Sequence, residues 1–400
     1  MRGRAAADGG PGRVQDVRRQ NLAVVLDAIR RTDRTTRAEI AAGTGLTKAA
    51  VSSLVAVLLD TGLIEEAGVA RDGERGRPGS GLVLNRQRGA LGAEVNVDYL
   101  AVGIVDVLGA LRAHQLMERR PGGLDVVLGD LQELARKIAG DAEAAGIRLL
   151  GGGLAVPGLV DPTRGLVLTA PNLGWQDAGL ERHLETLLPD SPLGVVLSNE
   201  ANSAALAELW YGHGASFGDY LYVSGEVGVG GGLIIGSKLF AGPRGHAGEI
   251  GHVVVQPDGL RCGCGGRGCL ETVAGQQAVF SAAGIRGATT ADRMAALMQA
   301  LDAGAPEALR AVERAGHYLG IALVSAARMV NVSAVILGGH FAGLQEWIRP
   351  SLLQGLETHA PGLLPADRVA FSELGQTAAL RGAAGGRLRE AFARPYRLLR

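Results

Sequence analysis

All three cysteines of this chain lie between positions 262 and 269, and glycine fills most of the positions between them. His252 precedes this segment. Glycine permits tight turns, so the segment can bring three thiolates and one imidazole around a single metal ion. We therefore predict a Zn²⁺ site formed by His252, Cys262, Cys264 and Cys269, with three buried structural thiols as the alternative. Four protein ligands leave no open coordination position, which makes the predicted zinc structural.

Composition and the N-terminal segment exclude several classes of protein. An odd number of cysteines gathered in one segment does not suit a disulfide-stabilised secreted scaffold. Met1–Pro11 is polar and rich in glycine and alanine, so it lacks the apolar segment of a signal peptide. No apolar run approaches the length of a membrane span. We therefore expect a soluble, cytoplasmic protein with no membrane partner.

Charge is unevenly distributed along a chain whose formal net charge is zero. Residues 1–90 contain 15 Lys and Arg against 10 Asp and Glu, whereas the rest of the chain contains 25 against 30. A basic N-terminal part on an acidic body favours a polyanionic partner for the N-terminal part.

The first 90 residues have a helical pattern with a recognisable start signal. Apolar residues at helical spacing predict a first helix over 15–31. Thr36 followed by Glu39 forms a capping box, which predicts that a second helix begins there. This helix is short, because glycines follow it at Gly43–Gly45.

A third helix is predicted from Thr47, as its N-cap, to about Asp60, with Gly62 as its stop. Two helices joined by a tight turn that contains glycine are typical of a helix-turn-helix, although a plain three-helix bundle also fits this spacing. The start of the third helix carries small or basic residues that suit close approach to a DNA major groove. These predicted DNA-contacting residues are Thr47, Lys48, Ala49, Ser52 and Ser53.

Residues 65–84 read as a two-stranded wing with a glycine-rich tip. The tip contains Arg75-Gly76-Arg77-Pro78, a narrow cationic segment. Such a segment suits the minor groove, where the negative potential attracts arginine. We therefore add Arg75 and Arg77 to the predicted DNA contacts.

From about Gly92 onward, strand and helix patterns alternate. Alternating apolar residues from Val95 to Val105 predict a hairpin that turns near Gly109. The further predicted elements are helices over 124–145 and 308–328, strands over 149–156, 194–197 and 334–337, and a second hairpin over 220–235. This order predicts α/β lobes with mixed sheets.

Several motifs in this body follow one another in a characteristic order. They are Pro157-Gly158, Pro171-Asn172-Leu173-Gly174-Trp175, Asn199-Glu200-Ala201-Asn202, Gly228-Val229-Gly230-Gly231-Gly232, Glu249-Ile250-Gly251-His252 and the cysteine cluster. This order resembles the ROK family, which groups bacterial repressors with sugar kinases, and the N-terminal part resembles its xylose-repressor-type branch. The resemblance covers about residues 14–385. It implies an actin-like (ribonuclease H-like) sugar-kinase fold, with two α/β lobes around a sugar cleft, and a zinc site that includes the histidine of Glu-x-Gly-His.

These patterns together give a domain plan. We expect a disordered tail over 1–13, a winged helix-turn-helix over 14–88, and a first α/β lobe over 89–198. A second α/β lobe over 199–375 should carry the zinc loop. A C-terminal helix over about 376–400 is expected to join the first lobe.

The resemblance also implies a set of sugar-contacting residues, whose side chains can donate and accept hydrogen bonds with sugar hydroxyls. They are Asn172, Asn199, Glu200, Glu249, His252 and Glu271. Read singly, Asn172 could shape a turn, Asn199 could cap a helix, and the glutamates could be surface charges. His252 is expected to use one ring nitrogen for the sugar and the other for zinc.

The loops that hold ATP in the kinases of this family are altered here. Those kinases have Asp directly after the Asn, where this chain has Glu200. Their first phosphate loop, Asp-x-Gly-Gly-Thr, corresponds to Glu94–Asp98, and their second, Gly-Thr-Gly, corresponds to Glu226–Gly228. The added carboxylates repel a triphosphate. We therefore expect a degenerate kinase domain that is not an enzyme.

The sequence predicts a sugar-responsive DNA-binding transcriptional repressor of carbohydrate-use genes. Its expected partners are double-stranded operator DNA and a small sugar effector; the sequence specifies neither the sugar nor the direction of its effect. The alternative is an active ATP-dependent sugar kinase, similar to a hexokinase or glucokinase, with an appended DNA-binding domain. Because winged-helix repressors usually read two half-sites, we expect a homodimer or tetramer.

Overall fold

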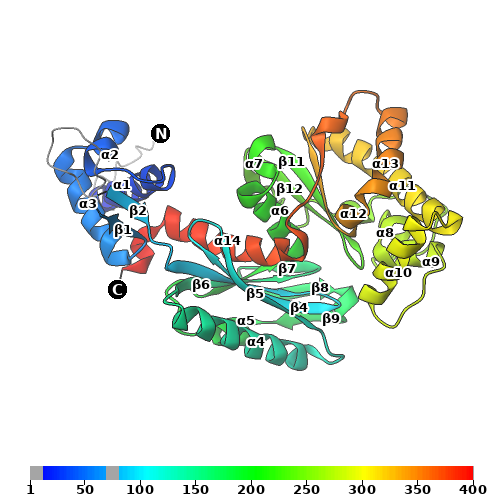
Figure 1. Cartoon of the computed structure of the whole chain (residues 1–400), viewed down its shortest axis with the longest axis horizontal. Helices are drawn as coiled ribbons and strands as arrows, with labels where there is room; N and C mark the ends of the chain where they lie inside the picture. Colours follow the sequence, from blue (N-terminus) through cyan, green and yellow to red (C-terminus); the bar gives the residue numbers. More distant parts are fainter. Residues whose placement is uncertain (1–11, 69–80, 400) are drawn as a thin grey trace, which may run out of the picture.

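The computed structural model describes residues 12–68 and 81–399, which begin with a small helical part (Figure 1). Its elements are α1 (Gly12–Arg30), α2 (Arg37–Thr44), α3 (Lys48–Thr61) and the antiparallel strands β1 (Ile64–Ala67) and β2 (Gly81–Leu84). Thr36 and Glu39 form the predicted capping box. Thr47 caps the start of α3, and Gly62 ends it in the left-handed conformation (φ 70°) that glycine adopts without strain. The predicted winged helix-turn-helix is therefore confirmed.

Two predictions fall at the limits of the described residues. The predicted tail over 1–13 lies outside them except for Gly12 and Arg13, which already belong to α1, so the helix begins earlier than expected. The predicted wing tip, with Arg75 and Arg77, also lies outside the described residues.

A five-stranded mixed sheet forms the first lobe, in the order β10-β6-β3-β4-β5. Its strands are β3 (Arg88–Val95), β4 (Tyr99–Asp106), β5 (Leu111–Glu118), β6 (Arg148–Val156) and β10 (Val195–Asn199). Helices α4 (Leu124–Ala144) and α5 (Glu181–Leu187) pack against one face through apolar residues. A small second sheet contains β7 (Leu159–Asp161), β8 (Leu166–Ala170) and β9 (Trp175–Gly179), with the 3₁₀ turn Pro171–Leu173 between the last two strands.

One prediction about this lobe is wrong. Val97 was expected to lie in a strand, but it lies in a tight turn between β3 and β4. The reason is local, because the side-chain oxygen of Asn96 accepts the backbone N–H of Asp98 at 3.2 Å and closes the turn. The expected turn near Gly109 is present between β4 and β5. Because there is a second turn at Val97, residues 88–118 form three strands where one hairpin was expected.

The second lobe is built on another five-stranded sheet, in the order β13-β12-β11-β14-β15. Its strands are β11 (Tyr220–Gly225), β12 (Val229–Ile235), β13 (Lys238–Leu239), β14 (Val335–Gly339) and β15 (Val369–Phe371). Its helices are α6 (Glu200–Tyr211), α7 (Gly214–Phe217), α8 (Glu271–Ala274), α9 (Gln276–Ala282), α10 (Thr290–Asp302), α11 (Pro306–Val330), α12 (His340–Gly343) and α13 (Gln345–His359). Short 3₁₀ turns span Ile250–His252, Ala366–Arg368, Gly375–Thr377 and Pro395–Leu398. The predicted two-lobe α/β fold is thus confirmed (Figure 1).

The last helix, α14 (Ala378–Ala393), covers the face of the first sheet opposite α4 (Figure 1). It is shorter than the predicted 376–400, because the chain leaves the helix before Pro395. Glycines allow the close packing: a Cβ at Gly382 would overlap the backbone of Ser203 in α6, and one at Gly92 would overlap the backbone of Leu380.

The same helix joins the N-terminal part to the first lobe. Leu388 and Ala391 of α14 belong to one apolar cluster with Leu22 and Leu26 of α1 and with Val105 of β4. The N-terminal part therefore shares a core with the body of the protein. No single helix in the described ranges has both the length and the apolarity needed to cross a membrane; α2 and α3, bent by 117°, reach those criteria only as a pair.

We predict that Gly382→Ala destabilises the protein, whereas Gly386→Ala does not. A methyl group at 382 would overlap the α6 backbone, at a cost on the order of 1–3 kcal/mol. At 386 nothing lies within 4 Å of the added carbon, so the alanine should stabilise the helix by up to about 1 kcal/mol. Urea unfolding of both variants measures the difference. Equal stabilities would contradict the close α14–α6 packing.

Candidate functional site

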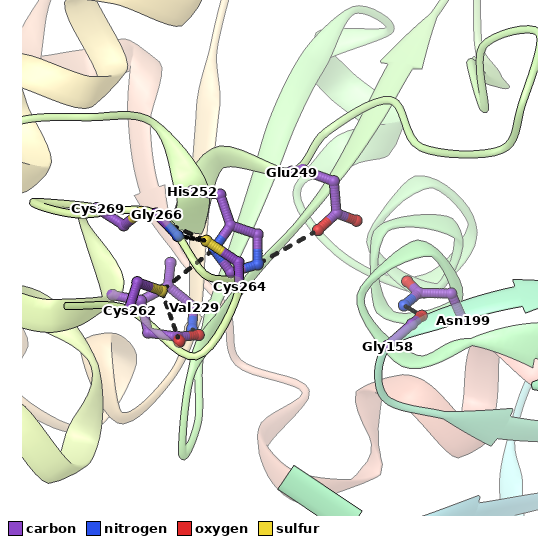
Figure 2. A network of polar contacts seen from close by, with 10 residues as sticks. Gly158, Asn199, Val229, Glu249, His252, Cys262, Cys264, Gly266 and Cys269 are labelled. Carbon is purple, nitrogen blue, oxygen red and sulfur yellow. Dashed lines mark hydrogen bonds and ion pairs between the residues drawn. The ribbon is translucent and has the colours of Figure 1, made fainter. Parts of the chain in front are cut away.

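The four predicted metal ligands come together in the structure (Figure 2). The donor atoms of His252, Cys262, Cys264 and Cys269 all lie within 4.8 Å of one another. The Sγ atoms of Cys264 and Cys269 are 3.7 Å apart, and Cys262 Sγ lies 3.6 Å from His252 Nδ1. Zinc–sulfur bonds of about 2.3 Å at tetrahedral angles place two sulfurs about 3.8 Å apart. The cluster therefore fits a tetrahedral metal ion.

Glycine and burial shape this metal loop. Gly268 has a φ of 72°, and a Cβ there would overlap the carbonyl oxygen of Gln256, so no other residue fits without displacing the loop. Burial raises the pKa of the Cys262 and Cys269 thiols. A bound dication would offset that effect and hold both residues as thiolates. The loop geometry and the donor set thus both suit a structural metal site.

Two of the predicted sugar-binding carboxylates adjoin the metal cluster. With its Nδ1 facing Cys262, His252 places its other ring nitrogen 3.9 Å from the carboxylate of Glu249 (Figure 2). Glu271 lies 3.6 Å from Cys262 Sγ, and its other oxygen accepts the backbone N–H of Val229 at 3.2 Å. His252 therefore directs its two ring nitrogens toward different groups, Glu249 and Cys262. Sugar contact by these residues stays a prediction.

The two predicted asparagines come from the other side of the site. Asn199 caps α6, since its side-chain oxygen accepts the N–H of Asn202 at 2.9 Å and its amide donates to the carbonyl of Gly158 at 2.8 Å. The helix-capping role considered for Asn199 is therefore confirmed. Asn172 lies in the 3₁₀ turn Pro171–Leu173. A Cβ at Gly228 would meet both Asn172, at 3.5 Å, and Glu271, so residues of the two lobes approach each other there.

Glu200 begins α6 and lies among other carboxylates. Its side chain accepts a hydrogen bond from Ser224 of β11 at 3.4 Å, and burial raises its pKa to about 7. Burial and the charge of Glu200 raise the pKa of Glu94 to about 8. Burial also raises the pKa of Glu226 well above its usual range, and the charges of Glu200, Glu94 and Asp98 add to this effect. The segments that correspond to kinase phosphate loops thus gather carboxyl groups whose pKa values are raised.

The predicted DNA-contacting residues of α3 share one exposed face. Those that the structure describes are Thr47, Lys48, Ala49, Ser52 and Ser53, all exposed. The opposite face of the helix is buried through Val51, Leu54, Val55 and Leu58. The bend of 117° between α2 and α3 lies within the range of helix-turn-helix motifs. This face is exposed among the described residues, and its contact with DNA stays a prediction.

Sequence profiles assign both parts of the chain. The profile of the ROK family matches residues 92–385, which is most of the chain. The chain belongs to the ROK family. A second profile, that of the MarR family, matches residues 23–74 and so covers the helix-turn-helix of this ROK protein.

Individual relatives include both repressors and kinases. The xylose repressor of Bacillus subtilis (strain 168) is 30% identical over 80% of this chain and 82% of its own length. The crystal structure of a ROK family transcriptional regulator, a homologue of the E. coli MLC protein, superposes with a TM-score of 0.78, covering 96% of this chain and 98% of its own at 24% identity. A ROK family glucokinase from Streptomyces griseus, in complex with glucose and AMPPNP, gives a TM-score of 0.65 over 74% of this chain and 98% of its own at 27% identity. The predicted winged helix-turn-helix with a sugar-kinase fold is thereby confirmed.

Sequence reasoning missed two hydroxyl groups that donate hydrogen bonds to carboxylates at the altered loops of this ROK protein. The hydroxyl of Thr290, in α10, donates to Asp98 at 2.9 Å and so links the two lobes. Within the second lobe, the hydroxyl of Ser224 donates to Glu200 at 3.4 Å. Thr290 is 192 positions from Asp98, and an isolated threonine gives no signal of such a contact.

We predict that the purified protein holds about one Zn²⁺ per chain and that Cys264→Ser loses it, because removing a thiolate leaves an incomplete tetrahedron. Gly263→Ala, in the same loop, should retain the metal, since nothing lies within 4 Å of its added carbon. Gly268→Ala should lose it. Elemental analysis under reducing conditions gives the stoichiometry. Absence of stoichiometric metal from the unmodified protein would contradict the assignment.

We predict that Glu94→Gln stabilises the protein more at about pH 8.5 than at about pH 5.5. A folded-state pKa near 8, against 4.5 for an ordinary Glu, means that the folded state binds this proton more tightly. The unmodified protein therefore loses stability as pH rises between those values, by about 1.4 kcal/mol per unit of pKa difference. Glutamine can keep the hydrogen bond from Tyr99 without a charge. Urea unfolding at both pH values, with the exposed Glu313→Gln as control, measures this, and a pH-independent difference would contradict it.

Proposed function

We propose that this ROK protein is a sugar-responsive transcriptional repressor whose kinase-like body senses a sugar without phosphorylating it. The observation that carries the proposal is the core shared by the winged helix and the ROK body, while the outer face of α3 stays exposed. A DNA-binding domain built into the body in this way can respond to a change in the body. The likeness to the Bacillus subtilis xylose repressor supports the same function.

The carboxylates near the interlobe boundary argue against phosphate transfer. ATP would bring a triphosphate to the segments of Glu94–Asp98 and Glu226–Gly228, where Asp98 stands in place of the kinases' threonine and Glu226 in place of a glycine. Catalysis of phosphate transfer requires the opposite complementarity. An active glucokinase-like enzyme with an appended DNA-binding domain is the second candidate, favoured by the likeness to the Streptomyces griseus glucokinase.

The proposed signal passes from the predicted sugar-contacting residues to the DNA-binding part through helices α6 and α14. Asn199 and Glu200 stand at the start of α6, and α6 packs on α14 where Gly382 meets Ser203. Near its other end α14 packs on α1 through Leu388. A sugar that bridges residues of both lobes would favour one lobe angle, and α14 would carry that change to α3.

The proposed assembly is a homodimer or tetramer on double-stranded operator DNA, with structural zinc in each chain. Two recognition helices must sit about one DNA turn, ~34 Å, or a multiple of it apart. A small change in the angle of α14 alters that spacing, so a sugar is expected to change operator affinity by about 5–150-fold.

Operator titration with and without sugar tests the proposal. Lys48→Ala and Ser52→Ala should each weaken specific operator binding by about tenfold, because the start of α3 is expected to meet base edges. Asp60→Ala, at the far end of the same helix, is the matched control and should change binding little. Glu249→Ala should abolish the sugar response while leaving sugar-free operator binding nearly intact.

One result would contradict the proposed repressor function: an operator affinity of the unmodified protein that stays constant at saturating levels of every common pentose and hexose. Release of ADP in a coupled assay with those sugars and ATP would instead support the kinase.

A further inference from the structure

The turn that replaces the kinases' first phosphate loop contacts the other lobe. It contains Asn96, Val97 and Asp98 and joins β3 to β4 in the first lobe. The hydroxyl of Thr290 donates to the carboxylate of Asp98 at 2.9 Å, and Thr290 is the first residue of α10 in the second lobe. A segment that no longer suits phosphate therefore makes a direct hydrogen bond between the lobes.

In the first lobe, further hydrogen bonds hold Asp98 in place. The side-chain oxygen of Asn96 accepts the backbone N–H of Asp98 at 3.2 Å. The backbone N–H of Arg119 donates to the carbonyl of Asp98 at 2.9 Å, and Arg119 Nε donates to the carbonyl of Val97 at 2.6 Å. The turn is thus tied to the segment that follows β5, so Asp98 moves together with the sheet of the first lobe.

In the second lobe, Thr290 is held by the start of α10 and by a neighbouring helix. Thr289 caps α10, and Arg293 donates to the Thr290 hydroxyl at 3.2 Å. Arg293 also donates to Gln277 of α9 at 2.6 Å, and its guanidinium lies 5.2 Å from the centre of the Phe280 ring. A hydroxyl that accepts a hydrogen bond from a cation is a stronger donor, so this arrangement strengthens the bond to Asp98.

The contact lies away from the places where the chain passes between the lobes. The chain crosses from β10 to α6 at Asn199, and from β15 to α14 before Ala378. The parallel strands β10, β6 and β3 end at one edge of the first sheet, and β4 follows β3 in that sheet. At about 4.8 Å per strand, the β3–β4 turn stands roughly 10–14 Å along this edge from the crossing at Asn199. A rotation of about 10° at that crossing would move Asp98 by about 2 Å, which is enough to break its hydrogen bond to Thr290.

At this lobe angle, predicted sugar-contacting residues of both lobes approach each other. A Cβ at Gly228 would meet Asn172 of the first lobe at 3.5 Å and also Glu271 of the second lobe. The bond between Asp98 and Thr290 therefore stabilises the arrangement in which a sugar could bridge the lobes.

We propose that Asp98 and Thr290 form a latch that holds the lobes at this angle and so lowers the sugar concentration needed for the response. A sugar that bridges the lobes favours the same angle, and its apparent affinity scales with the fraction of molecules already at that angle. The effect on the sugar response rests on the proposed function, whereas the effect on the lobe angle does not.

Two substitutions test the latch in the full-length protein. Thr290→Val keeps the branched shape and removes the hydroxyl, and Asp98→Ala removes the acceptor. Small-angle X-ray scattering without sugar should give a larger radius of gyration for both variants than for the unmodified protein. Operator titration with D-xylose, D-glucose and the other common pentoses and hexoses should show that the active sugar acts at a concentration about threefold to tenfold higher.

Further variants separate the hydrogen bond from other effects. Thr290→Ser keeps the hydroxyl and Asp98→Asn keeps an accepting oxygen, so both should stay close to the unmodified protein. Thr186→Val makes the same change on α5, where the hydroxyl donates to carbonyls of its own helix, and should alter neither measurement. Thr290→Val combined with Asp98→Ala should have no larger effect than either change alone, because both remove the same contact.

The outcomes separate the latch from the proposed function. A radius of gyration that is the same for Thr290→Val, Asp98→Ala and the unmodified protein overturns the latch. A larger radius with an unchanged sugar concentration overturns its role in the sugar response. If no sugar changes the operator affinity of the unmodified protein, the proposed function fails, and the scattering measurement still decides the latch.

Discussion

Helix α14 contacts the N-terminal part and both lobes, and close backbone approaches at glycine make this possible. Gly382 lies against the backbone of Ser203 in α6, and Gly92 of the first sheet lies against Leu380. Toward its end the helix carries Leu388 into the apolar cluster that contains the helix-turn-helix core. Contacts between backbones leave little room for adjustment, so a shift of α6 displaces α14 rather than being absorbed by side chains. The arrangement of the DNA-binding part depends on this contact.

The cluster of His252, Cys262, Cys264 and Cys269 is a second element that can hold the surrounding chain in place, in the second lobe. A metal ion held there would fix a glycine-rich loop that has few side chains of its own to pack, and the loop would in turn hold the ring of His252 and the carboxylate of Glu271. A bound metal would therefore stabilise the part of the second lobe that faces Asn172 and Asn199. Binding of a ligand between the lobes would act on a preformed surface on this side, which limits the ordering cost.

The sequence predicted much of this molecule because many of its signals are local. A capping box at Thr36 and Glu39, a glycine stop at Gly62 and period-two apolar strands all act through neighbouring residues. The same reasoning failed at Val97, where the turn depends on the side chain of Asn96. Sequence reasoning also could not predict that the side-chain amide of Asn199 donates to the carbonyl of Gly158, because Gly158 lies on another segment of the chain.

The sequence by itself determined the donor set of the metal cluster, the helix-turn-helix and the replacement of phosphate-loop residues by acids. These features follow from which residue types stand at short spacing. Only the tertiary structure decided that Glu94, Glu200 and Glu226 act on one another, that Thr290 joins Asp98, and that α14 contacts both α6 and the apolar cluster of the helix-turn-helix. Each of these relations joins segments far apart in the chain, and their proximity is fixed by strand order and by the packing of helices on sheets, which no local pattern encodes.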